Sequence, residues 1–136
     1  MNPRATTTRL TARAGLVLAL FLVVGCGSDE KLSQVSGTVT YDGKPVPAGT
    51  IFFDPVAGGA KSQGFATIKN GEFDTAQGGR GLGAGKFQVR VLGFDGKEAN
   101  DAPLGRSLFP EHTQSHEQTG ANATLDIKVL KTPKGQ

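Results

Sequence analysis

Two histidines and two glutamates form the one closely spaced group of side chains in this sequence with metal-ligand chemistry: Glu111, His112, His116 and Glu117. On an α-helix, residues i and i+4 share one face, so His112 and His116 could hold one metal ion there. The surrounding segment, FPEHTQSHEQTG, is polar and has no apolar stripe that would hold a helix against a core. The composition therefore favours a surface loop, and we expect neither a metal ion nor a cofactor.

The same histidines fall in the longest connection that the sequence predicts, about residues 95–121. A structureless connection longer than about 12 to 15 residues is usually functional or disordered. Phe109 supplies an apolar side chain that could anchor a partner. The candidate binding residues are therefore Phe109, His112, His116 and Glu117, and in a surface loop their joint replacement by alanine would leave the melting temperature nearly unchanged.

Enzymatic motifs are incomplete. In GGRGLGAGK, residues 78–86, Arg80 stands where a P-loop needs glycine, and Phe87 follows where it needs serine or threonine to bind Mg²⁺ and phosphate. No Gly-x-Ser-x-Gly nucleophile motif occurs either. We expect no catalytic residue and no enzyme, with an uncharacterised hydrolase left as one alternative.

The net charge of +3 is concentrated at the start of the chain. Residues 1–25 hold three arginines and no acid, and the remainder holds 12 basic and 12 acidic residues. No cluster of Lys and Arg of the kind that binds phosphate groups occurs elsewhere. Nucleic acid is therefore not an expected partner.

A single cysteine, Cys26, follows an apolar run, AGLVLALFLVV, that is itself preceded by a basic segment. This order is typical of a cleaved export signal over residues 1–25. The run is shorter than the ~20 residues that a membrane-spanning helix needs. The sequence from residue 27 onward has no cysteine, so a disulfide or a Cys-based zinc site is excluded there.

Val23-Val24-Gly25-Cys26 resembles the lipobox of bacterial lipoproteins. The resemblance implies cleavage between Gly25 and Cys26, acylation of Cys26, and attachment to membrane lipid in the cell envelope. Gly27 replaces the aspartate that commonly retains such proteins at the inner membrane. The outer membrane is therefore the expected location if the cell has two membranes.

From residue 34 the pattern becomes that of β-strands. Apolar and polar residues alternate with a period of two, and we expect strands at 34–41, 50–55, 62–69, 72–75, 86–94 and 123–130, with a seventh at 78–85 or 104–109. Asp42-Gly43 and Asn70-Gly71 are typical of tight hairpin turns. No window shows helical periodicity.

Residues 35–130 resemble a transthyretin-like, carboxypeptidase-regulatory-like domain, through VSGTVTYDGKPVPAGTIFF, NGEFDT and GLGAGKFQVRVLGFDG. The resemblance implies an all-β, transthyretin-like (prealbumin-like) Greek-key β-sandwich of about seven strands. We divide the chain into a signal peptide (1–25), a lipidated tether (26–33), the sandwich (34–131) and a tail (132–136). The expected role is a non-enzymatic binding or structural one, with an envelope protein as candidate partner; a ligand-binding or metal-binding lipoprotein that uses residues 95–121 is the other alternative.

Overall fold

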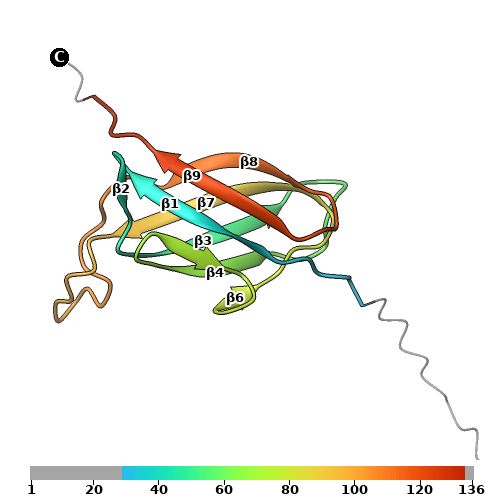
Figure 1. The fold of residues 1–136 in the computed structure, drawn as a ribbon, viewed down its shortest axis with the longest axis horizontal. Helices are drawn as coiled ribbons and strands as arrows, with labels where there is room; N and C mark the ends of the chain where they lie inside the picture. Colours follow the sequence, from blue (N-terminus) through green and yellow to red (C-terminus); the bar gives the residue numbers. More distant parts are fainter. Residues whose placement is uncertain (1–28, 134–136) are drawn as a thin grey trace, which may run out of the picture.

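The computed structural model describes residues 29–133, and over that range the chain forms β-strands and their connections without a helix. Figure 1 shows the strands as a curled sheet, and the buried apolar side chains form one cluster. In chain order the strands are β1 (Val35–Tyr41), β2 (Lys44–Pro45), β3 (Ala48–Pro55), β4 (Gly64–Lys69), β5 (Glu72–Asp74), β6 (Gly79–Arg80), β7 (Gly85–Phe94), β8 (His112–Gln118) and β9 (Ala123–Val129). The prediction of an all-β, sandwich-like domain is confirmed.

The strand order in the sheet is β2-β1-β5-β4-β3-β7-β8, with β6 paired to β4 and β9 paired to β1. Every pair is antiparallel except β1 and β9, which run parallel from Val35 opposite Ala123 to Tyr41 opposite Val129. The first long strand and the last strand are therefore neighbours, as Figure 1 shows.

The core follows the predicted alternation. In β7 the side chains of Phe87, Val89 and Val91 are buried, whereas Gln88 is exposed and Arg90 is half-buried on the outer face. The strands on both sides of the curl contribute to one buried cluster: Val35, Val39, Val46, Ile51, Phe53, Ala66, Ile68, Phe73, Leu82, Phe87, Val89, Val91, Phe109, Ile127 and Val129.

The two predicted hairpin turns are confirmed by their backbone geometry. Asp42 and Gly43 have φ of 50° and 79°, and Asn70 and Gly71 have φ of 51° and 78°. Positive φ at both central residues is the type I′ turn, whose twist matches that of the paired strands. Asparagine, aspartate and glycine adopt this conformation with the least strain.

Two strands were not predicted: the two-residue β2, where prolines were expected to prevent pairing, and β8. Residues 112–118, which we placed inside a long connection, form β8, which pairs with β7 along its length. The side chains of β8 that face inward are polar, so the strand lacks the apolar alternation that reveals the others. The connection between β7 and β8 is therefore shorter than predicted and comprises residues 95–111.

The alternation of strand directions gives the domain two distinct ends. At the tether end lie residues 29–34, before β1, together with the connections 56–63 and 119–122. At the far end lie the two type I′ turns and the connection 95–111. Figure 1 shows these two groups of connections at opposite ends of the strands.

Candidate functional site

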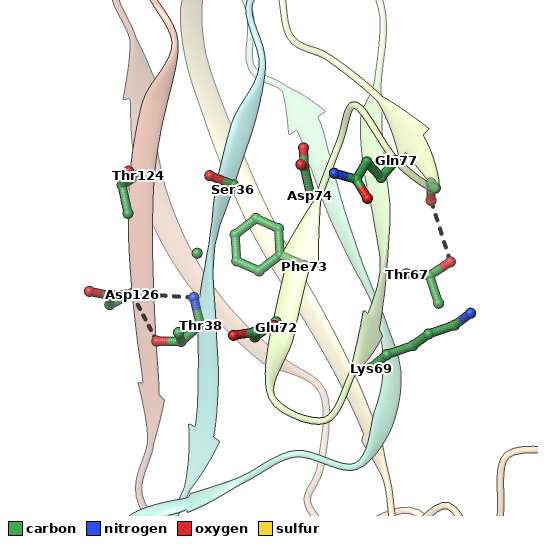
Figure 2. A pocket seen from close by; sticks show the side chains of 12 residues that line it. Ser36, Thr38, Thr67, Lys69, Glu72, Phe73, Asp74, Gln77, Thr124 and Asp126 are labelled. Atoms are coloured by element: carbon green, nitrogen blue, oxygen red, sulfur yellow. Dashed lines mark hydrogen bonds between the residues drawn. The ribbon is translucent and has the colours of Figure 1, made fainter.

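A polar groove of about 550 Å³ lies on the outer face of β9, β1, β5 and β4. Figure 2 shows its side chains converging from these strands and from the turn after β5. The residues that line it are mostly hydroxyl or charged ones at outward positions of their strands: Ser36, Gly37, Thr38, Thr67, Lys69, Glu72, Phe73, Asp74, Gln77, Gly78, Thr124 and Asp126.

The short strand β5 shapes one wall of the groove. Asp74 Oδ1 accepts a hydrogen bond of 2.8 Å from the backbone N–H of Ala76, which turns the chain away from the sheet. Thr75 is buried, where its Oγ1 accepts a bond of 2.9 Å from the N–H of Val35 and donates one of 2.7 Å to Gln34 Oε1. The turn after β5 is therefore fixed to the start of β1.

The opposite wall depends on a contact between the two parallel strands. Asp126 Oδ1 accepts hydrogen bonds from Thr38 Oγ1 at 2.8 Å and from Thr38 N–H at 3.2 Å. Gly37 lies next to this contact, and a Cβ at Gly37 would lie 1.8 Å from the backbone oxygen of Leu125. The close approach of β1 to β9 therefore requires glycine at this position.

The groove is acidic. Glu72, Asp74 and Asp126 supply three carboxylates against the single ammonium group of Lys69. In the described part of the chain, the ion pairs found belong to Arg90, which lies outside the groove. Such a surface accepts hydrogen bonds and attracts cationic groups.

A second charged cluster lies on the outer face of β3 and β7. Arg90 donates hydrogen bonds to Asp54 and, at 3.2 Å, to Glu111 Oε2, and its guanidinium carbon lies 5.0 Å from the ring centre of Phe52. The hydrogen bond from Arg90 holds the pKa of Asp54 below its ordinary value, and the bond to Asp54 raises the pKa of Arg90. The charged groups of Arg90, Asp54 and Glu111 are paired with one another, so we interpret the cluster as a contact that stabilises the pairing of β3 with β7.

The far-end connection is held by backbone hydrogen bonds along its length, up to the pair between Ala99 and Ala102 at its tip. Asp95 Oδ1 accepts hydrogen bonds from the N–H groups of Lys97 at 2.9 Å and Arg106 at 3.0 Å. These bonds, that from Lys97 foremost, lower the pKa of Asp95. Asp95 N–H also donates to the Arg106 carbonyl at 2.9 Å. The connection is therefore closed at its base by one carboxylate.

The four candidate binding residues do not form one site. Phe109 is 7% exposed, and its ring centre lies 5.0 Å from that of Tyr41. His112 and His116 are half-buried on one side of β8, and Glu117 is exposed on the other. The prediction that Phe109 is a surface anchor is wrong, because its ring completes the core at the far end.

The helical arrangement considered for the histidines does not occur. Four residues along a strand span about 13 Å, too far for both rings to bind one ion. His112 Nε2 pairs with Gln114 Oε1 at 3.2 Å and His116 Nε2 with Gln118 Oε1 at 3.0 Å. Residues 29–133 contain no group of three or more His, Cys, Asp or Glu side chains placed to hold a metal ion.

The buried position of Phe109 gives a prediction opposite to the one drawn from sequence. Phe109→Leu should lower the free energy of unfolding by about 1 kcal/mol, because the ring contact with Tyr41 is lost. Urea unfolding measures the change. Glu117→Ala is the control and should leave the unfolding midpoint nearly unchanged, since Glu117 is exposed. A midpoint for Phe109→Leu equal to that of the control would contradict the packing described here.

Gly25 and Cys26, the predicted cleavage and lipidation residues, lie outside the described residues. Within residues 29–133 there is no helix long and apolar enough to span a membrane.

Comparisons with known proteins add little. No family model matches the chain, and no curated protein matches it. Solved structures that match include a 9R-lipoxygenase from Cyanothece PCC8801, with 13% identity and a TM-score of 0.34, over 72% of this chain and 17% of the lipoxygenase chain. The chain thus spans a small part of that enzyme, and a likeness this weak carries no argument about fold or function.

Sequence reasoning missed the groove. The alternation of residues within 34–41 and 123–130 indicates outward positions for Ser36, Thr38 and Asp126, and the structure has them there, with Thr124 on the same face. The sequence does not show that 35–41 and 123–129 are neighbouring strands. That pairing, rather than any motif, brings these polar side chains together.

Proposed function

We propose that this chain is a bacterial envelope lipoprotein, anchored through acylated Cys26, whose domain binds an envelope protein without catalysing a reaction. The domain is of the transthyretin-like Greek-key type, and the outer membrane is its location in a cell with two membranes. The observation that carries the proposal is the order of segments: a basic start, an apolar run, the sole cysteine, and then a β-domain whose hydrogen bonds begin at Glu30.

The physics of anchoring supports a lipid at Cys26. One acyl chain binds a membrane only marginally, whereas two or three chains hold a protein there stably. A thioether-linked diacylglycerol meets that requirement through one side chain. The chain then needs no second anchor.

The transthyretin-like type is supported by where the sequence resemblance falls. VSGTVTYDGKPVPAGTIFF spans β1, β2 and most of β3, NGEFDT spans the second hairpin turn and β5, and GLGAGKFQVRVLGFDG spans β7. Each matched motif therefore coincides with a strand or a turn of the observed sheet. The resemblance and the strand positions agree in the parts that the motif covers.

The acidic groove supports a binding role. Its carboxylates face outward from a rigid sheet, and an extended segment with lysine or arginine side chains complements them in charge and shape. Recognition by exposed charges would be weakened by salt. A basic segment of an envelope protein is the partner that fits.

The anchoring part of the proposal is tested by Cys26→Ser. This variant should incorporate no labelled palmitate and should accumulate as uncleaved precursor, because the sole acceptor thiol has been removed. Ser28→Ala, two residues away, is the control and should be labelled like the unchanged protein. Labelling of Cys26→Ser would refute lipidation at this residue.

The binding part is tested with a photoreactive amino acid placed at Thr124 or at Lys128. Both side chains are exposed on β9, but only Thr124 lines the groove. A crosslinker at Thr124 should capture a defined protein in the native envelope, and raising the salt concentration should reduce the yield. Equal capture from both positions, or capture from Lys128 alone, would exclude the groove as the binding surface.

A further inference from the structure

The chain is fastened to the tether end of the domain well before β1 begins. Glu30 Oε1 accepts a hydrogen bond of 3.0 Å from the backbone N–H of Lys61, and Glu30 Oε2 accepts one of 2.6 Å from Ser62 Oγ. The bonds from Ser62 and Lys61 hold the pKa of Glu30 below its ordinary value. Glu30 therefore joins the start of the domain to the connection between β3 and β4.

A second attachment follows three residues later. Ser33 N–H donates to the Leu82 carbonyl at 2.8 Å, and Leu82 N–H donates to the Ser33 carbonyl at 2.9 Å. Ser33 and Leu82 are both buried. Residues 30–33 are thus held at two points.

Glycine makes room for this attachment. A Cβ at Gly83 would lie 1.9 Å from Glu30 Oε1, and a Cβ at Gly81 would lie 2.6 Å from the Ser33 carbonyl oxygen. A larger residue at Gly81 would displace the backbone of Ser33, and one at Gly83 would displace the side chain of Glu30 from its hydrogen bonds. The attachment of residues 30–33 is therefore built into the domain.

The distance from Cys26 to this attachment is limited by covalent geometry. Glu30 is the fourth residue after Cys26, and a fully extended chain of four residues spans about 14 Å. Acyl chains on Cys26 would therefore hold Glu30 close to the headgroups of the bilayer. The tether is too short for the domain to turn its far end to the membrane, because the ten residues of β7 alone span about 33 Å.

The surface beside Glu30 suits lipid headgroups. Three cationic side chains, Lys31, Lys61 and Arg80, are exposed there beside one exposed acidic neighbour of Glu30, Asp29, and Arg80 donates to Ser62 Oγ at 3.2 Å. The connection from β3 to β4 adds Val56, which is 40% exposed, and the small exposed residue Ala57. Cationic side chains around a small apolar tip favour contact with an anionic bilayer surface.

We propose that the 56–63 connection rests on the lipid headgroups of the bilayer that holds Cys26, so that the 95–111 connection points away from the membrane. This inference rests on the proposed lipidation of Cys26. The short reach from Cys26 to Glu30 and the attachment of residues 30–33 are the observations that carry it.

The test uses the lipidated full-length product, in which the acylated Cys26 leaves an introduced thiol as the only free one. Ala57→Cys and Asn100→Cys are labelled with the same fluorophore; both positions are exposed, one at each end of the domain. The proteins are placed in vesicles of phosphatidylethanolamine and phosphatidylglycerol that contain a headgroup nitroxide. Mass spectrometry first measures acylation of Cys26, and circular dichroism verifies the fold of each variant.

With Cys26 acylated, quenching at residue 57 should be severalfold stronger than at residue 100. An insert of about ten Gly and Ser residues after Gly27, which adds a mean span of about 17 Å, should reduce the quenching at residue 57. Equal quenching at both positions in the acylated protein would overturn the orientation and leave the anchoring intact. An unacylated Cys26 would overturn the proposed function and this inference together.

Discussion

Val89→Asp is expected to leave the domain of residues 27–136 unfolded or close to it. Val89 is fully buried in β7, between the neighbouring strands β3 and β8. An aspartate carboxylate there would lie within the buried apolar cluster, and an unpaired buried charge costs about 3–5 kcal/mol. A whole domain has only about 5–15 kcal/mol of stability. The loss should be visible as a missing unfolding transition in circular dichroism on heating.

Thr113→Asp is the matched control, because it introduces the same side chain at an exposed position. Thr113 lies opposite Arg90 on the outer face, where a carboxylate gains a cationic neighbour. Arg90→Ala should also be mild, since its ion pairs are on the surface and contribute about 0–1 kcal/mol. A mild effect of Val89→Asp with a severe effect of Thr113→Asp would mean that the inner and outer faces of this sheet are reversed.

Gly37→Ala should cost about 3 kcal/mol, the upper part of the usual range for an oversized side chain in a packed site. The added Cβ would lie 1.8 Å from the Leu125 carbonyl oxygen and 2.6 Å from its carbon, both of which are backbone atoms that no rotamer change can move. Strand β1 must then separate from β9. Urea unfolding should show a lower midpoint, and crosslinking from Thr124 in the groove should fall with it.

Gly78→Ala is the control for this substitution. Gly78 also lines the groove, but its nearest neighbour would be the side chain of Thr67 at 4.0 Å, which is ordinary contact. The free energy of unfolding of the Gly78→Ala variant should therefore change little. If the two variants unfold at the same urea concentration, the close contact between β1 and β9 is not as described.

The strands that the sequence predicted are those in which one face meets the core. In β7 and β9 apolar residues recur at every second position, and these positions are the buried or half-buried ones. The turns were predictable because a type I′ turn needs positive φ at both central residues, and Asp-Gly and Asn-Gly are among the few residue pairs that adopt it readily. Local chemistry was sufficient for these elements.

Strand β8 could not be predicted in this way. It lies at the edge of the sheet and carries His112, Gln114, His116 and Gln118 on its inward side. Its pairing partner, β7, is separated from it by residues 95–111, so no short hairpin signal marks the pair. The burial of Phe109 followed from the same missed strand, since the residue leads directly into β8.

The groove was beyond sequence reasoning for a different reason. The outward positions of each strand were readable, but a polar outward position is expected on any half-exposed strand. The order of strands in the sheet decides which outward positions become neighbours. That order pairs residues 35–41 with residues 123–129, which lie near opposite ends of the domain's sequence. The groove therefore depends on which strands pair in the sheet, and no single segment of the sequence encodes it.

The parallel pairing of β1 with β9 also governs when the domain can be completed. Val35 and Ala123 are 88 residues apart, so the N-terminal strand has no partner on that side until the C-terminus is present. Contacts so distant in sequence form slowly because a large loop must close first. Under the export proposed for this chain, a molecule whose last strand is still inside the export channel would lack this partner of β1 and would remain incompletely folded until translocation ends.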